Sequence, residues 1–108
     1  MANLNVFKNI SANLETSNTV LYTAPNGYTS IILMAQVANI NTAPATVVFG
    51  WNNNVANTEL VYNYSVPTNE AANLLTGKLV LQNGHSIYAS SDTADALKIT
   101  FSILESLN

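Results

Sequence analysis

Hydrophobic and polar residues alternate one by one along much of this chain. In residues 95–104 the apolar side chains fall on one face, and Lys98, Thr100 and Ser102 fall on the other. Residues 58–66 and 75–82 follow the same rule. Because successive side chains of a β-strand point to opposite sides of its sheet, this period of two predicts half-buried strands. No segment shows convincing helical periodicity.

Residues 30–40 depart from this rule because apolar side chains occupy both faces. One face is expected to hold Ile31, Leu33, Ala35 and Val37, and the other Ile32, Met34 and Ala38. Such a strand either lies at the centre of the core or is covered on its outer side by another chain. The second alternative makes Ile32 and Met34 candidate interface residues.

Turn-forming residues separate the alternating runs. Pro25 and Gly27 lie in one turn, and the pair Asn83-Gly84 indicates a tight hairpin. We expect eight strands, at residues 4–8, 19–23, 29–40, 45–51, 57–66, 73–81, 85–90 and 95–104. This spacing predicts an all-β fold, a two-sheet β-sandwich of about eight antiparallel strands. Alternation does not reveal strand order, so jelly-roll and immunoglobulin-like topologies both stay open.

The core is expected to form from the apolar faces of these strands. Its candidate residues are Val20, Tyr22, Ile31, Leu33, Val37, Val47, Phe49, Leu60, Tyr62, Leu79, Leu81, Ile87, Leu97, Ile99, Phe101 and Ile103.

The first residues form a separate unit in this interpretation. Residues 1–16 are expected to be an N-terminal arm or edge strand, and residues 17–108 the β-sandwich domain. A short terminal strand can complete its own sheet or add to the edge of a neighbour. The second alternative makes Leu4, Val6 and Phe7 candidate interface residues.

Charged residues are scarce, and this excludes several classes of function. Only 8% of residues are charged, no Arg is present, and the formal net charge is −3. Three lysines cannot neutralise a run of phosphates, so we expect no nucleic-acid partner. The longest apolar run is too short to span a bilayer, so we expect no membrane partner. The first 15 residues lack the features of a secretory signal, and without Cys there is no disulfide framework.

Candidate chemistry is equally sparse. The single histidine, His85, follows the Asn83-Gly84 turn with no evident catalytic partner. Asp92 and Asp95 share a Ser/Thr-rich turn, where capping of backbone amides explains them. No glycine-rich phosphate motif occurs. We therefore expect no enzyme, no cofactor and no metal site.

Aromatic residues offer a binding alternative. Trp51 ends its expected strand and is expected at a rim, where it is another candidate interface residue. With Tyr28 or Tyr88 it could form a platform that stacks against sugars.

The strand and turn sequences resemble a family of small β-sandwich virion proteins of tailed bacteriophages. The residues that carry this likeness are 19–32, 37–39, 46–48, 66–67, 75–87 and 101–105, within residues 17–105. Gly27, Gly77 and Gly84 match the family's turns, whereas His85 stands where the family often has an acidic residue. The resemblance implies a structural part of the particle, either a capsid decoration or cement protein or a tail component, with no active site.

These observations together predict a virion structural protein made in the host cytoplasm. The leading hypothesis is a capsid decoration protein on the particle surface, which forms a homo-oligomer, with a trimer favoured, and bridges subunits of the major capsid protein. The alternative is a receptor- or carbohydrate-binding module of the tail or baseplate.

Overall fold

The computed structural model describes residues 5–107, which contain nine β-strands and no helix. The strands are β1 (Asn5–Asn13), β2 (Thr19–Thr23), β3 (Tyr28–Asn39), β4 (Ala45–Asn52), β5 (Asn57–Val66), β6 (Ala71–Asn73), β7 (Leu79–Leu81), β8 (Ser86–Ser91) and β9 (Leu97–Leu107). Every strand pair is antiparallel. The part of the chain described here accordingly has no helix that could cross a membrane. The predicted all-β sandwich is confirmed.

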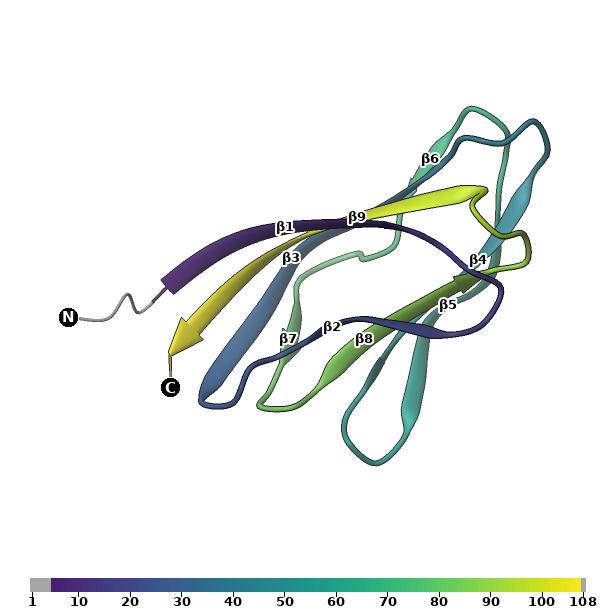
Figure 1. Cartoon of the computed structure of the whole chain (residues 1–108). Coiled ribbons are helices and arrows are strands. Elements are labelled where there is room, and N and C mark those ends of the chain that lie inside the picture. The colour runs from purple at the N-terminus through teal and green to yellow at the C-terminus, as the bar shows by residue number, and fades with distance from the viewer. Residues whose placement is uncertain (1–4, 108) are drawn as a thin grey trace.

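The strands form two layers (Figure 1). The first sheet has the order β1-β9-β3-β6, with β7 also paired to β3, and the second has the order β2-β8-β4-β5. If β6 and β7 count as one interrupted strand, the order is that of a jelly roll, a double-sheet fold found in viral capsid and lectin domains. The topology that alternation left open is therefore the jelly roll and not the immunoglobulin order.

The interruption between β6 and β7 replaces one continuous strand expected over residues 73–81. The Leu74 amide still donates to the Ala35 carbonyl of β3, at 2.8 Å. The chain then leaves the sheet and rejoins β3 where Leu79 pairs with Ile32. This edge of β3 consequently has no strand partner at Leu33 and Met34.

The core lies between the two sheets. Nine predicted core residues are buried: Val37, Val47, Phe49, Leu81, Ile87, Leu97, Ile99, Phe101 and Ile103. Tyr22 and Leu79 pack against this core while partly exposed. Leu14, within the N-terminal arm or edge strand expected over residues 1–16, is also fully buried. Its amide donates to the Leu97 carbonyl, so the β1–β2 connection closes one end of the sandwich.

A bulge in β3 reverses the expected faces of that strand. Ile32 pairs with Ile103 and Met34 with the preceding residue Ser102, so Leu33 is the extra residue. An extra residue shifts the alternation by one position. Even-numbered side chains therefore point into the core before the bulge and odd-numbered ones after it. Ile31 and Leu33 are only half-buried, and their assignment to the core is wrong.

Bulges in β2 and β5 explain why three other residues predicted for the core are exposed. Val20 is 60% exposed because the register of β2 skips a residue after it. In β5, Glu59 pairs with Gly50 and Val61 with Phe49, so Leu60 is the extra residue. Leu60 and the following Tyr62 are exposed rather than buried.

Candidate functional site

Four apolar side chains form a continuous row across the outer face of the first sheet. Phe7 of β1 pairs with Leu104 of β9, Leu104 pairs with Ile31 of β3, and Ile31 pairs with Val80 of β7. Directly paired residues of an antiparallel sheet lie on the same face, with Cβ atoms about 5 Å apart. We call Phe7, Leu104, Ile31 and Val80 the apolar row.

The ends of the apolar row are open to solvent. Phe7 is 73% exposed and Val80 is 51% exposed, while Leu104 and Ile31 between them are half-buried. A phenyl ring held this far into water is a candidate anchor for a partner, because aromatic side chains supply large contact area with few torsions to fix.

A hollow adjoins the apolar row at the interrupted edge of β3. Its volume is about 270 Å³. It is lined by Leu33, Met34, Ala35, Asn73, Leu75, Thr76, Gly77 and Lys78. The side chain of Met34 is 37% exposed beside it. A flexible thioether next to a hollow can adapt to the shape of a partner's side chain.

The surroundings of the apolar row are polar and nearly uncharged. The neighbouring register row contains Asn9, Ser102 and Met34. In the strands as described, the outward positions of the first sheet include one charged residue, Lys98 of β9. A protein partner can cover such a surface with little loss of ionic hydration.

The residues predicted for an interface do not lie together on one surface. Phe7 belongs to the apolar row and Met34 lies beside it. Val6 pairs with Glu105 and is half-buried. Ile32 is fully buried, so its expected place on the outer face is wrong, because the bulge at Leu33 had not been foreseen. Leu4 lies outside the described residues.

Trp51 takes no part in an aromatic platform with Tyr88. It pairs with Ile87, packs against the core, and lies with its ring centroid 5.3 Å from that of His85. Tyr88, one residue further along β8, points to the opposite face of the sheet and is 3% exposed. The two rings therefore cannot stack on one ligand.

Alternation also missed three of the four residues of the apolar row. Leu104 and Val80 received no role, and Ile31 was assigned to the core. Local sequence could not predict that these residues are neighbours, because the row depends on the pairing of strands that lie far apart along the chain. The one available signal was the apolar character of residues 31–34, which the bulge made ambiguous.

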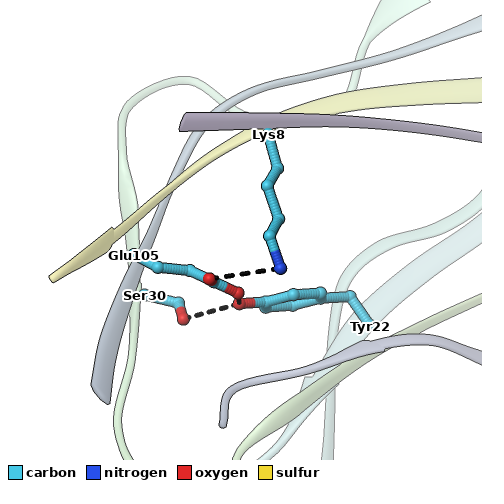
Figure 2. A network of polar contacts seen from close by, with 4 residues as sticks. All are labelled: Lys8, Tyr22, Ser30 and Glu105. Carbon is cyan, nitrogen blue, oxygen red and sulfur yellow. Dashed lines mark hydrogen bonds and ion pairs between the residues drawn. The ribbon is translucent and has the colours of Figure 1, made fainter. Parts of the chain in front are cut away.

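A polar cluster joins the two sheets behind this face, and Figure 2 shows its four residues. Tyr22 of β2 donates to Glu105 Oε2 of β9 at 2.5 Å, and its phenol oxygen lies 2.8 Å from Ser30 Oγ of β3. Since the phenol proton goes to Glu105, Ser30 is the donor to Tyr22. Lys8 of β1 holds Glu105 Oε1 at 3.2 Å.

This cluster fixes the first sheet from the inside. Burial raises the pKa of Tyr22, and the hydrogen bond to Glu105 raises it further, so the phenol keeps its proton. The Glu105 side chain is almost fully buried, and the Lys8 ammonium supplies the opposite charge that such a carboxylate needs. Lys8 and Phe7 are neighbours on β1 that point to opposite faces. The Lys8–Glu105 contact therefore helps to hold the strand that presents Phe7.

The residues considered for chemistry have structural contacts. His85 Nδ1 accepts from the Gln82 amide at 3.3 Å within the hairpin. Asp92 Oδ1 accepts from the Thr46 amide at 3.0 Å, so it caps a strand end as expected. Over residues 5–107, no three His, Cys, Asp or Glu side chains come together in a way that could hold a metal ion.

Comparisons with known proteins place this fold among solved structures. Neither a scan against protein-family models nor a search of curated proteins found a match. A chain of the acid-stable capsid of Helicobacter pylori bacteriophage KHP30 is similar with a TM-score of 0.61 and 11% identity, over 99% of this chain and 90% of that chain. A chain of the T13 IBDV viral particle has a TM-score of 0.57 and 8% identity, over 98% of this chain and 32% of that chain.

A third similar structure comes from Bacillus endospore appendages, described as disulfide-linked pili. Its TM-score is 0.54 with 15% identity, over 96% of this chain and 88% of that chain. At such low identities these likenesses show a common fold and nothing finer.

Proposed function

We propose that this chain is a structural protein of a phage virion, and that it acts as a capsid decoration or cement protein. The apolar row is the observation that carries the proposal. The jelly-roll fold, which a phage capsid chain shares, supports it. The sparse charge of the outer face supports it as well, since neighbouring subunits can approach closely without strong repulsion.

The apolar row would hold the chain on the shell by burial of apolar area. Full burial of an aromatic side chain removes about 150–250 Å² from water. With 73% of Phe7 still exposed, docking could bury roughly 150 Å² more of this side chain, or about 4 kcal/mol gross at ~25 cal/mol per Å². Ordering of the interface offsets part of this gain. Repetition over many equivalent sites would then supply avidity.

The partner in this proposal is the major capsid protein, and the site is the junction between its subunits. A row that crosses four strands of one sheet suits a seam, because its two exposed ends can contact different neighbours. The favoured trimer stays a prediction. Native mass spectrometry of the purified chain at micromolar concentration tests it, and a monomer under these conditions would contradict it.

Rebinding to stripped particles tests the docking proposal. Virions depleted of this protein are mixed with wild-type chain, Phe7→Ser or Val80→Ser, and the bound fraction is measured after sedimentation. Both variants should bind at least tenfold more weakly. Val55→Ser is the matched control, because Val55 is 88% exposed in the β4–β5 loop, away from this face. Equal binding by all four proteins would refute the role of the apolar row.

The position on the particle distinguishes decoration from the tail alternative. Cryo-EM of the intact virion should show density of this fold on the head, with the outer face of β1, β9 and β3 against the shell. Density confined to the tail or baseplate would replace decoration with the receptor-binding alternative.

A further inference from the structure

A second hollow lies on the outer face of the other sheet, opposite the apolar row. Its volume is about 330 Å³, near the lower end of the range for small-molecule sites. It is lined by Asn18, Val20, Asn52, Asn57, Ser86 and Tyr88. The proposed docking to a shell uses none of these residues.

The missing side chain of Gly50 shapes the floor of this hollow. Val20, Tyr88, Gly50 and Glu59 follow one another across β2, β8, β4 and β5. A Cβ atom at Gly50 would come within 2.5 Å of Tyr88 Oη, so the Tyr88 ring occupies the space above this glycine. The Tyr88 phenol donates to Glu59 at 3.4 Å. Burial and the charge of Glu59 raise the pKa of Tyr88, so the phenol keeps this proton.

Existing hydrogen bonds fix the orientation of the amide side chains in the hollow. Asn52 Oδ1 accepts from the Asn54 amide at 2.7 Å, and Asn52 Nδ2 donates to Asn57 Oδ1 at 2.7 Å. Asn18 Oδ1 accepts from Ser90 at 2.8 Å. The carboxamide oxygens are thus engaged, while the NH₂ groups of Asn57 and Asn18 have donors left over. The hollow therefore offers N–H donors fixed in direction.

The chemistry of these groups selects an uncharged ligand that is rich in oxygen. In the described part of the chain, no basic side chain lines the hollow. Among the described residues, Lys8 is bound to Glu105, and Lys78 and Lys98 belong to the connection and strand of the other sheet. An anion would find no counter-charge, and Glu59 beside Tyr88 would repel it. Val20, 60% exposed at the rim, adds an apolar contact. Amide donors beside one apolar side chain match a sugar, which has hydroxyl and ring oxygens around a face of C–H groups.

We propose that this hollow binds a neutral sugar unit of a surface glycan. The site faces away from the apolar row, so a chain docked on a shell by the first sheet would present the hollow outward. The inference does not depend on the docking proposal, because the hollow is complete within one chain.

A glycan array tests the inference directly. The labelled full chain is applied to printed neutral oligosaccharides of hexoses and N-acetylhexosamines, beside sialylated and sulfated versions of the same glycans. Binding to neutral glycans is expected, and its affinity is then measured by isothermal titration calorimetry. Absence of any signal, or a preference for the anionic versions, would overturn the proposal.

Two variants locate the binding. Asn57→Ala removes an amide donor and Val20→Ser removes the apolar contact, and each should weaken binding at least tenfold. Asn13→Ala is the matched control, because Asn13 is an exposed asparagine on β1 of the other sheet. This variant should bind the glycan with wild-type affinity. Thermal unfolding checks that each variant is folded.

NMR gives an answer that does not depend on any variant. The bound glycan should shift the backbone amide signals of residues 18–20, 52–57 and 86–88 of the wild-type chain. Shifts confined to other residues, or wild-type affinity in both folded variants, would exclude this hollow as the site.

Discussion

Ile31 and Ile32 are adjacent in β3, yet truncation of each should affect a different property of the protein. Ile32 is fully buried opposite Ile103 in the core. Ile32→Ala therefore leaves a cavity, and deletions of this kind lower the free energy of unfolding by about 2–5 kcal/mol. Ile31 is half-buried on the outer face, so Ile31→Ala should lower it by about 1 kcal/mol or less.

The expected difference is large enough to measure by calorimetry. For a domain of this size, 1 kcal/mol corresponds to about 4–8 °C in Tm. A loss of 3 kcal/mol in Ile32→Ala should thus lower Tm by roughly 12–24 °C, against a few degrees for Ile31→Ala. The particle-binding assay is run at a temperature below the Tm of both variants. There Ile31→Ala, and not Ile32→Ala, should show the larger loss. Ile31→Ala should bind about 3- to 10-fold more weakly, because it shortens the apolar row, and Ile32→Ala should bind as wild type.

The pair of variants tests the bulge at Leu33. Without the bulge, the faces of the two residues would be exchanged, and so would the two results. A larger loss of Tm in Ile31→Ala than in Ile32→Ala would refute the assignment of faces and, with it, the place of Ile31 in the apolar row.

Three further changes test other parts of the structure. The pKa of Tyr22 is raised above its ordinary value of 10.0, so its contribution to stability is complete below pH 10 and falls as the pH rises further. Tyr22 should contribute a slope of about 1.4 kcal/mol per pH unit, measured by urea unfolding. Tyr22→Phe should reduce the wild-type slope by this contribution and leave that of Tyr88, whose pKa is also raised, whereas Tyr64→Phe should not reduce it. Gly50→Ala should lower the free energy of unfolding by about 1–3 kcal/mol through overpacking, because its Cβ would lie 2.4 Å from the Thr58 carbonyl oxygen. Gly77→Ala, with no atom within 4 Å, should leave calorimetric stability nearly unchanged.

Regular strands could be predicted from the sequence, and bulged strands could not. Over residues 97–106 of strand β9, buried residues alternate with exposed or half-buried ones, and the predicted core residues Leu97, Ile99, Phe101 and Ile103 are all buried. In β2 and β3 one extra residue reverses the faces, and in β5 the register shifts twice, and no local sequence feature marks where these shifts occur. The bulge in β3 is hardest to foresee, because apolar residues stand on both sides of it.

The candidate surfaces depend even more on tertiary structure. Phe7 could be found because it is apolar on an otherwise polar face, and Met34 because apolar residues occupy both faces of its strand. Their neighbours Leu104 and Val80 come from other strands, and only the strand order brings them together. The hollow over Gly50 likewise depends on a ring from β8 that lies across a glycine of β4, and this juxtaposition has no pattern along the chain.

The central place of β9 in the first sheet has a consequence for biosynthesis. Strand β9 lies between β1 and β3, and the ribosome makes it after the other eight strands. Until β9 emerges, β1 and β3 lack their common neighbour, and the first sheet cannot close. Leu104, which connects Phe7 to Ile31, arrives with that same strand. A chain truncated before β9 would therefore lack the residue that connects Phe7 to Ile31, and a nascent chain would gain this residue only once β9 has emerged.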